Sequence, residues 1–519
     1  MASNDKKLCV LVIVDGWGIG PAAKGNAITT AKLPHYHQLV KKYSYTTLKA
    51  ASKSVGLPMG QEGNSEAGHM NIGAGRVVEQ DAVVISKSIN NGTFFRNPAF
   101  MGALAHVQKY NSDVHLVGMI TGNQSAHSDP DHLISLITLF NRKKVRNVYL
   151  HLFTDGRDAP PYYAQKLFQS FHGVFNSYAT VATVMGRFYG MDRKKEWSRT
   201  QLAFDAMVSG KGLKETTPED AVLHAYARGE SDEFIKPTII VDEAGKPKGL
   251  IKNNDAVVFF NLRSDRARQM CKPFAQTDFY QANKGSFKPT AKPKNLFLVA
   301  MTDFGPDMPK LMTAYPSREI VETLPMSLPG YRQLAIAESE KFAHVTYFFN
   351  GGYDHIVAGE AREMIPSPNL KHYEDEPLMS LDKTTARVVT AIQKREFDFI
   401  VMNIANADMI AHSGKFWATV KACEYTDAAL GKITKAVLAK DGICIITADH
   451  GNAEMVIDPK TGEPETEHST NPVPFIVVKS GPKLKLRKNG ILGDIAPTIL
   501  ELLQLEKPHD MTGKTLITH

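Results

Sequence analysis

The stretch Leu8-Cys-Val-Leu-Val-Ile-Val14, followed by Asp15-Gly-Trp-Gly18, decides the fold class of this chain. An unbroken apolar run rich in β-branched residues predicts a strand that is buried on both faces, as in a parallel sheet. The run is too short to cross a bilayer, which takes about 20 residues. Because it ends at Asp15, it predicts an ionisable side chain at the carboxyl end of a buried strand, where ligands bind in such sheets.

Similar apolar runs recur along the chain and alternate with longer amphipathic stretches. They begin at Val114, Val145, Ala256, Asn295, Asp398 and Gly442. This alternation predicts strands connected by helices, the α/β class. Further runs also end in polar clusters, which are Thr154-Asp-Gly-Arg-Asp158, Asn261-Leu-Arg-Ser-Asp-Arg266, Asn406-Ala-Asp408 and Asp449-His-Gly-Asn452. The chemistry is therefore expected at strand ends.

Composition predicts an ordinary globular protein with more than one core. The 519 residues suggest two or three domains, and 43% apolar with 22% charged residues is typical of a folded chain. Lysine plus arginine exceeds aspartate plus glutamate by 61 − 54 = 7, which is too weak an excess to indicate a nucleic-acid surface. The basic string Lys483-Leu-Lys-Leu-Arg-Lys488 alternates with apolar residues and predicts a charged edge strand.

Four scattered cysteines without a CxxC pair predict neither a disulfide framework nor a zinc knot. The residues before Leu8 contain no cleavage site, and no stretch approaches about 18 consecutive apolar residues. A cytoplasmic protein without a membrane segment is expected.

Residues that could bind a pair of divalent cations lie in five separate segments: Asp15, Ser65, Asp408 with His412, Asp449 with His450, and His468. Asp408 and His412 are four residues apart, so one face of a helix would present both, although a solvated helix face shows the same spacing. Mixed carboxylate and imidazole ligands suit Mn²⁺, Zn²⁺ or Mg²⁺, and the histidines favour Mn²⁺ or Zn²⁺.

Ser65 lies in the string Gly63-Asn-Ser-Glu-Ala-Gly-His69. A serine hydroxyl is a poor nucleophile at neutral pH unless a bound cation lowers its pKa. The glycines would let the backbone approach the ions, and a helix beginning at Ser65 would direct N–H groups toward phosphate oxygens. The alternative is a plain turn with a helix N-cap.

A second set of residues could hold an anionic substrate. It comprises His127, Arg157, Asp158, Arg187, Arg193, Arg263 and Arg266. Guanidinium groups bind carboxylate or phosphate bidentately, although each arginine alone could equally be a surface residue. Asp158, beside Arg157, could take and return a hydroxyl proton while its neighbour holds the substrate. Lys341 lies in an amphipathic segment and by its spacing alone would be solvated.

Along its whole length the chain resembles the cofactor-independent phosphoglycerate mutases of the alkaline-phosphatase-like superfamily. Eight strings match in order: VIVDGWG, GNSEAGHMNIGAGR, FTDGRDAPP, GRFYGMDR, FFNLRSDRARQ, AESEKFAHVTYFFNGG, NADMIAHSG and TADHGNAE. The resemblance implies a metal-dependent enzyme that interconverts 3-phosphoglycerate and 2-phosphoglycerate in glycolysis and gluconeogenesis through a phosphoserine. It implies no need for 2,3-bisphosphoglycerate, no nucleic-acid or membrane partner, and a monomer.

The same resemblance implies roles for individual residues. The catalytic residues would be Ser65, Asp158 and Lys341. One metal would be bound by Asp408, His412 and His468, and a second by Asp15, Ser65, Asp449 and His450, with Mn²⁺ first and Mg²⁺, Co²⁺ or Zn²⁺ as alternatives. Substrate contacts would come from His127, Arg157, Asp158, Arg187, Arg193, Arg263, Arg266 and Lys341.

The resemblance also implies two domains. Residues 1–79 and 317–519 would form a metal-binding, alkaline-phosphatase-like α/β/α sandwich, and residues 80–316 an α/β phosphotransferase domain inserted through two hinges. The chain departs from the family pattern at Gly122-Asn-Gln-Ser-Ala-His127-Ser, where the family reads Ser-Asp-Gly-Gly-Val-His-Ser. Smaller departures are Ser264, Ala407 and Ala411, and none replaces an expected ligand.

Two rival functions remain open. A phosphatase or phosphopentomutase of the same superfamily would use the same metal ligands, and the arginine-rich middle of the chain favours transfer over these. A non-catalytic protein that binds anions or nucleic acid would rest on the net charge and on the string 483–488.

Overall fold

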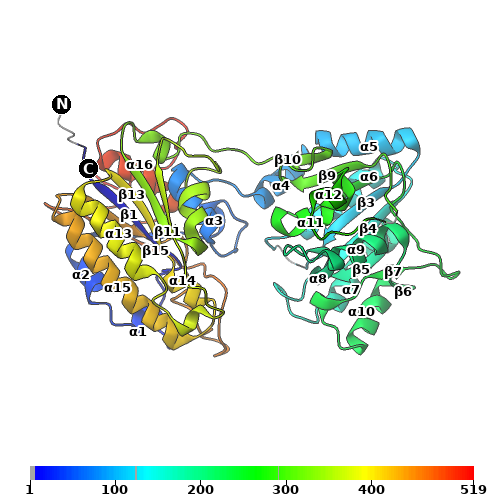
Figure 1. The fold of residues 1–519 in the computed structure, drawn as a ribbon, viewed down its shortest axis with the longest axis horizontal. Helices are drawn as coiled ribbons and strands as arrows, with labels where there is room; N and C mark the ends of the chain where they lie inside the picture. The colour runs from blue at the N-terminus through cyan, green and yellow to red at the C-terminus, as the bar shows by residue number, and fades with distance from the viewer. Residues whose placement is uncertain (1–5, 123–124, 290) are drawn as a thin grey trace. The chain divides into compact units, whose positions relative to one another are not determined.

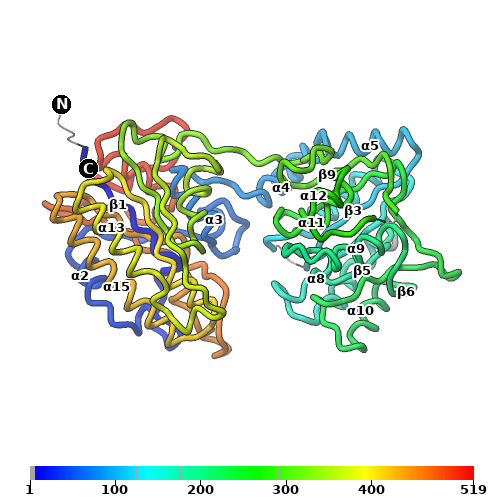
Figure 2. The backbone as a smooth tube through the Cα atoms, viewed as in Figure 1, coloured from blue at the N-terminus to red at the C-terminus, as the bar shows by residue number. Residues whose placement is uncertain are grey.

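The computed structural model describes residues 6–122, 125–289 and 291–519. The chain divides into two compact units, one formed by Met1–Gln80 with Arg318–His519 and the other by Asp81–Ser317. In the tube of Figure 2, the blue start of the chain and its yellow-to-red end belong to the first unit, and the cyan-to-green middle forms the second. The α/β prediction is confirmed, because each unit is built on one eight-stranded sheet between helices.

The sheet of the first unit has the order β12-β11-β13-β1-β14-β15-β2-β16. Its strands are β1 (Cys9–Val14), β2 (Ser44–Lys49), β11 (Gln333–Glu338), β12 (Ala361–Ile365), β13 (Phe399–Ile404), β14 (Ile443–Thr447), β15 (Val473–Val478) and β16 (Gly490–Ile491). The five strands from β12 to β14 are parallel, and β15 is antiparallel to both neighbours. The central strands β1, β13 and β14 are buried at every residue, as their continuous apolar sequences predict.

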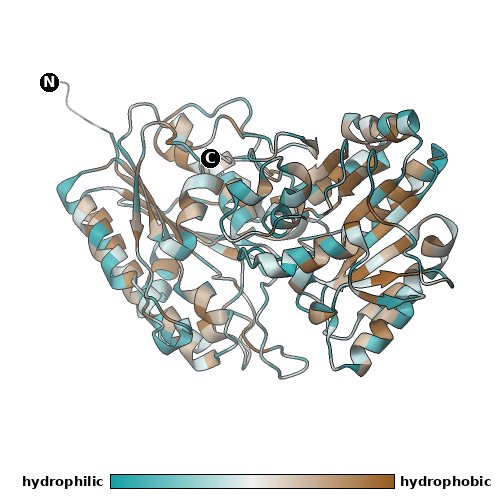
Figure 3. Ribbon diagram, turned by 45° about the vertical axis from the view of Figure 1, so that its right-hand side comes forward, coloured by the Kyte–Doolittle hydropathy of each residue, from teal (hydrophilic) through white to brown (hydrophobic). Residues whose placement is uncertain are grey.

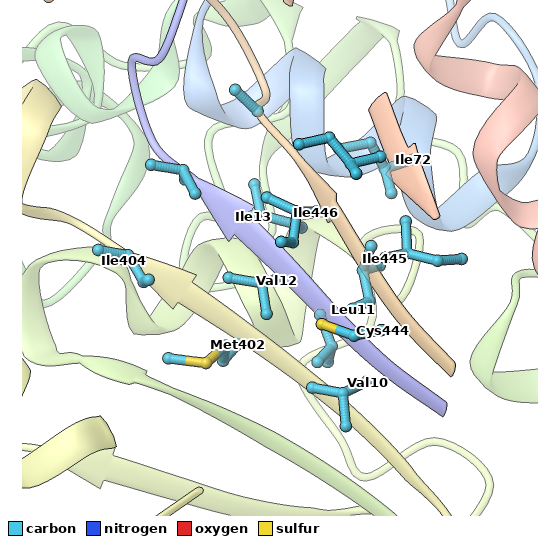
Figure 4. Close-up of a cluster of buried hydrophobic side chains, with 14 of the residues drawn as sticks. Val10, Leu11, Val12, Ile13, Ile72, Met402, Ile404, Cys444, Ile445 and Ile446 are labelled. Atoms are coloured by element: carbon cyan, nitrogen blue, oxygen red, sulfur yellow. The ribbon is translucent and has the colours of Figure 1, made fainter. Parts of the chain in front are cut away.

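Helices cover both faces of this sheet. They are α1 (Ala27–Thr30), α2 (Pro34–Lys42), α3 (Ser65–Ala74), α13 (Leu381–Lys394), α14 (Asn406–Ala411), α15 (Phe416–Leu438) and α16 (Ile495–Leu502). In Figure 1, α2, α13 and α15 lie together on one side of the sheet, and α3 lies on the other. Figure 4 shows the core between the layers, where Val10, Val12, Met402 and Ile446 crowd the middle strands.

The sheet of the second unit has the order β10-β9-β8-β3-β4-β5-β7-β6. Its strands are β3 (Val114–Met119), β4 (Val148–Thr154), β5 (Thr180–Gly186), β6 (Leu213–Glu215), β7 (Thr238–Ile240), β8 (Ala256–Phe259), β9 (Phe297–Thr302) and β10 (Leu311–Tyr315). Only β7 runs antiparallel to β5, and the other pairings are parallel. Figure 3 shows the apolar character concentrated in the strands of this sheet.

The helices of the second unit are α4 (Asp81–Asn90), α5 (Pro98–Tyr110), α6 (Pro130–Arg142), α7 (Ala164–Ser177), α8 (Arg187–Gly190), α9 (Trp197–Ser209), α10 (Pro218–Ala227), α11 (Ser264–Ala275) and α12 (Phe279–Ala282). Within the described ranges of both units, none of the helices is both long enough and apolar enough to cross a membrane.

Each apolar run that predicted a strand contains one, but the edge strand expected at Lys483–Lys488 is wrong. Only Leu486 forms an isolated bridge there, with Ile517. Arg487 donates hydrogen bonds to the carbonyls of Thr515 and Lys514 and pairs with Asp494. These contacts fasten the segment to the C-terminal residues, so it does not continue the ladder of the sheet.

Candidate active site

The candidate metal ligands of the first unit follow the carboxyl ends of neighbouring parallel strands. Asp15 follows β1, Asp408 lies on the short helix after β13, and Asp449 and His450 follow β14. Lys341 ends a single turn of 3₁₀-helix, Ser339–Lys341, after β11. Because parallel strands end at one edge of the sheet, these residues are neighbours in space although far apart in sequence.

Asp408, His412 and His468 converge on one point. The Nε2 atoms of His412 and His468 lie 3.1 Å apart, and Asp408 Oδ1 lies 3.5 Å and 3.4 Å from them. The Nδ1 atom of His412 lies 2.8 Å from the carbonyl of Thr466, and that of His468 lies 2.8 Å from the carbonyl of Gly63. Since a carbonyl only accepts, each Nδ1 carries the proton, and in the neutral ring Nε2 keeps its lone pair for a ligand.

Ser65 is the first residue of α3, and the side chain of Asn64 caps that helix by accepting from the Ala67 amide. The N-cap alternative and the predicted helix start are thus both present. Ser65 Oγ lies 2.9 Å from His450 Nε2, and it donates to Asp15 Oδ1 at 3.2 Å. The hydroxyl is buried and faces a carboxylate and an imidazole.

Lys341 is buried, contrary to the solvated position that its spacing alone suggests. Its Nζ donates to Asp15 Oδ1 at 2.9 Å, to Ser65 Oγ at 2.9 Å and to Asp408 Oδ2 at 2.6 Å. Burial would raise the pKa of both carboxyls, but the ammonium of Lys341 holds each pKa below its usual range. Burial likewise opposes the charge of Lys341, yet Asp15 and Asp408 raise the pKa of its ammonium.

His450 is fully buried between acidic groups. Burial disfavours its charged form, but Asp449 and Asp15 outweigh that effect and raise the pKa of His450 to about 9. In the protein without bound cations His450 therefore carries a proton at neutral pH. Metal binding at this ring would have to displace that proton.

Two glycines allow the backbone to come this close. Gly16 has φ +68°, and a Cβ there would lie 2.8 Å from Asp408 Cβ. A Cβ on Gly68, in α3, would lie 2.6 Å from Asp449 Cβ. Side chains at these positions would push the helix and the loops of the acids apart.

The donor sets fit divalent cations. Three groups have ligand atoms within 4.8 Å of one another: Asp408, His412 and His468; Asp15, Asp408 and His450; and Asp15, His69 and Asp449. Within the described part of the chain, Asp449 Oδ2 is buried and accepts no hydrogen bond, which suits an oxygen that awaits a cation. The first group is the first metal site expected from the sequence. The other two groups share Asp15, and one of them includes His69, which was not expected.

Asp158 and Arg187 form the centre of a second cluster, at the carboxyl ends of β4 and β5. Arg187 Nη1 donates to Asp158 at 2.6 Å and to Asp155 at 2.5 Å. His127 Nε2 lies 3.2 Å from Asp158 Oδ2 and 3.1 Å from Arg187 Nη2. His127, together with Arg187, holds the pKa of Asp158 well below its usual range, so Asp158 is a carboxylate.

The other arginines expected to bind substrate lie in the same unit. Arg193 and Arg263 both pair with Asp265, at 2.6 Å and 3.2 Å. Burial, followed by the charges of Arg193 and Arg187, lowers the pKa of Arg266. Among the described residues the side chain of Arg266 forms neither a hydrogen bond nor an ion pair. Crowded like charges with an unpaired guanidinium favour an anionic ligand.

The altered turn before His127 does not remove this histidine from the cluster. Asn123 and Gln124 lie outside the described residues. Ser125 Oγ accepts hydrogen bonds from the amides of His127 and Ser128, and the carbonyl of His127 accepts from the amide of Leu262 at 2.8 Å. These bonds hold His127 next to the end of β8.

Four buried residues near these clusters were not assigned from the sequence. His69 Nδ1 lies 3.3 Å from Asp449 Oδ2, and Asn403 donates to Asp15 at 2.7 Å. Asp155 joins Arg187, and Glu454 accepts from several loops of the first unit. Except for Asn403, all lie inside the matching strings, but polar residues in a motif do not reveal which of them face one another.

Comparisons with known proteins find relatives along nearly the whole chain. The sequence model of the Metalloenzyme superfamily matches residues 7–507. A 2,3-bisphosphoglycerate-independent phosphoglycerate mutase of Methanosarcina barkeri is 45% identical over 517 residues, covering 99% of this chain and 98% of the relative. That of Chloroflexus aggregans is 44% identical, covering 98% of each. The crystal structure of Leishmania mexicana phosphoglycerate mutase at low cobalt concentration superposes with a TM-score of 0.78 at 27% identity, covering 100% of this chain and 99% of that one.

The fold and the superfamily match place the chain among metalloenzymes of the α/β class. The chain belongs to the family of 2,3-bisphosphoglycerate-independent phosphoglycerate mutases. The resemblance seen in the sequence is thereby confirmed.

Proposed function

We propose that this protein interconverts 3-phosphoglycerate and 2-phosphoglycerate, a step of glycolysis and gluconeogenesis, through a phosphoserine at Ser65. The names of relatives that cover nearly the whole chain support the reaction and its independence of 2,3-bisphosphoglycerate. The observation that carries the proposal is the buried Ser65 hydroxyl, held within 3.2 Å of Asp15, His450 and Lys341 at the start of a helix.

Two divalent cations are proposed, with Mn²⁺ first because the donors mix carboxylates with imidazoles, and with Mg²⁺, Co²⁺ or Zn²⁺ as alternatives. One would be held by Asp408, His412 and His468, and the other by Asp15, Ser65, Asp449 and His450. When bound, such ions lower the pKa of a coordinated hydroxyl and stabilise negative charge on phosphoryl oxygens.

Ser65 would act as the nucleophile in the first half of the cycle. Its hydroxyl proton, which Oγ donates to Asp15 Oδ1 in the structure, would be lost to solvent when a bound cation lowers the hydroxyl pKa. Oγ then forms a bond to phosphorus while the bond from phosphorus to O3 of the glycerate breaks. Lys341 Nζ, which lies 2.9 Å from Ser65 Oγ, would stabilise the negative charge on the transferred phosphoryl oxygens. Glycerate remains bound and later attacks with its 2-hydroxyl.

Asp158 would move the proton of the glycerate hydroxyl. As a carboxylate it can accept the proton of the 2-hydroxyl when that oxygen attacks phosphoserine. In the first half of the cycle Asp158 would take up one proton as Ser65 loses one, and it would donate that proton to the 3-oxygen as that oxygen leaves. The substrate carboxylate would be held by guanidinium groups of the second cluster, in which Arg157, Arg193, Arg263 and Arg266 join Arg187 and His127.

The division of labour between the units is part of the proposal. Residues 1–79 and 317–519 would bind the metals, and residues 80–316 would hold the substrate and complete the transfer. Phosphoserine must be shielded from water, which gives a physical reason for hinges between such domains. A cytoplasmic monomer without nucleic-acid or membrane partners is proposed as well, supported for the compartment by four free cysteines.

One assay tests the reaction. Conversion of 3-phosphoglycerate is measured without added bisphosphoglycerate, before and after chelation, and again after Mn²⁺ is restored. We expect activity to disappear on chelation and return with Mn²⁺, and Ser65→Ala to be inactive under all conditions. If inorganic phosphate appeared faster than 2-phosphoglycerate, the protein would be a phosphatase and the proposal would be wrong.

A further inference from the structure

Glu454 lies at the junction of three loops that carry candidate metal ligands. Its Oε2 accepts from the amide of Gly18 at 3.0 Å and from the amide of Asn452 at 2.9 Å. Its Oε1 accepts from the Ser469 hydroxyl and, at 3.0 Å, from the side chain of Asn471. Only 4% of Glu454 is exposed.

Each of these donors is close in sequence to a candidate ligand. Gly18 is three residues after Asp15, Asn452 is two after His450, and Ser469 directly follows His468. A fourth segment joins through Asn452, whose Nδ2 donates to Asp408 Oδ1 at 2.8 Å. One carboxylate thus connects the loops that carry Asp15, His450 and His468.

Two glycines leave room for the side chain of Glu454. A Cβ on Gly18 would lie 2.2 Å from Glu454 Cδ, and a Cβ on Gly451 would lie 2.4 Å from its Oε1. The backbone of both loops therefore approaches the carboxylate as closely as the chain can.

A carboxylate is the side chain that this junction requires. All four donors are neutral N–H or O–H groups, and each carboxylate oxygen accepts two of them. An amide has only one oxygen, and its NH₂ group would face two donors. Four hydrogen bonds compensate the cost of burying this charge, and they tie it to the loops that carry candidate metal ligands.

We propose that Glu454 is a positioning residue that sets the metal affinity of the site by holding the loops of Asp15, His450 and His468 in register. This inference rests on the proposed metal-dependent function. Residues that orient metal ligands without touching the ion typically change metal affinity about 10- to 100-fold when they are replaced.

The test is a calorimetric titration of the chelated, full-length protein with MnCl₂ alone, for wild type and Glu454→Gln. We expect the wild type to bind two Mn²⁺ ions and Glu454→Gln to bind with a Kd about 10- to 100-fold higher. Electron paramagnetic resonance of bound Mn²⁺ should show an altered line shape, because the ligand geometry is loosened.

Glu360→Gln is the matched control. Glu360 is also a glutamate of the first unit with 4% exposure, and it accepts from Asn350 at 2.8 Å and pairs with Arg362. We expect Glu360→Gln to lower the melting temperature and leave the Mn²⁺ Kd within about twofold of wild type. A merely structural role of Glu454 would give that same pattern, and this result would overturn the inference.

Three other outcomes of the Mn²⁺ titration also test the role of Glu454. If Glu454→Gln does not fold, Ser469→Ala decides, because it removes one of the four donors, and an unchanged Mn²⁺ Kd would refute the positioning role. If wild type itself bound no Mn²⁺, the proposed function would fail and the inference with it. If wild type bound two ions and Glu454→Gln matched its Kd, only the inference would fail.

Discussion

Replacing Lys341 by methionine should destabilise the metal-free protein far more than removing an ordinary lysine. In the first unit the Lys341 ammonium is 2.9 Å from Asp15 and 2.6 Å from Asp408, and all three side chains are at most 7% exposed. At an effective dielectric constant of about 20, each contact contributes on the order of 6 kcal/mol of Coulomb attraction. Desolvation cancels much of this, and removing one partner of such a buried pair costs about 3–5 kcal/mol.

The assay is urea unfolding of chelated, full-length protein in a Trp197→Phe background. The remaining tryptophans, Trp17 and Trp417, lie in the first unit, so their fluorescence reports on that unit alone. We expect Lys341→Met to lower the free energy of unfolding by about 3–5 kcal/mol. Saturating Mn²⁺ should reduce the difference in the free energy of unfolding between Lys341→Met and the parent protein, because bound cations neutralise the same carboxylates.

The control is Lys421→Met, which removes an exposed lysine 3.0 Å from Glu424 on α15. That change should leave the free energy of unfolding nearly unchanged, because an exposed ion pair contributes little to stability. If Lys341→Met unfolded within about 0.5 kcal/mol of wild type without metal, the ammonium would not be neutralising the acids. The electrostatic account of the site would then be wrong.

Three further predictions concern a close approach, a guanidinium pair and a buried histidine. Gly68→Ala should weaken Mn²⁺ binding about 10-fold, because its Cβ would press on Asp449, and an unchanged Kd would contradict this. Arg187→Lys should lower kcat/KM for 3-phosphoglycerate about 10- to 100-fold, because the charged hydrogen bonds that orient Asp158 are disturbed. Burial lowers the pKa of His151 well below 6.5, so only the unfolded chain binds a proton there, and stability present above pH 6.5 is lost as pH falls. In a Trp17→Phe, Trp417→Phe background, whose fluorescence comes from Trp197 alone, the loss should be about 1.4 kcal/mol between pH 7.5 and 5.5. An equal slope in the same background with His151→Gln would refute it.

Much of the fold could be predicted because buried parallel strands have continuous apolar sequences. The central strands β1, β13 and β14 each lie within an apolar run found in the sequence, as Cys9–Val14 lies within Leu8–Val14. The edge strand predicted at residues 483–488 was wrong because alternation shows only that one side of a segment is apolar. The contacts of Arg487 with the C-terminal residues are non-local, so the local sequence does not indicate them.

Asp15, Asp449 and His450 could be named because each stands where an apolar run stops, whereas Ser65 and His468 were assigned their roles by the family resemblance. What no local pattern indicated is that Lys341 is buried between two carboxylates, or that Glu454 joins three loops. Burial of a charge depends on partners that lie tens to hundreds of residues away, so it leaves no periodic mark on its own segment.

The sequence by itself determined the α/β class, the seven strands that lie in its apolar runs, the family and the side chains able to do the chemistry. Only the tertiary structure decided which of these side chains meet. Parallel strands end at one edge of a sheet whatever their distance in sequence, so Asp15, Asp408 and Asp449 become neighbours only when the sheet forms. The electric field at Ser65 is a sum over such neighbours, and it therefore belongs to the folded chain.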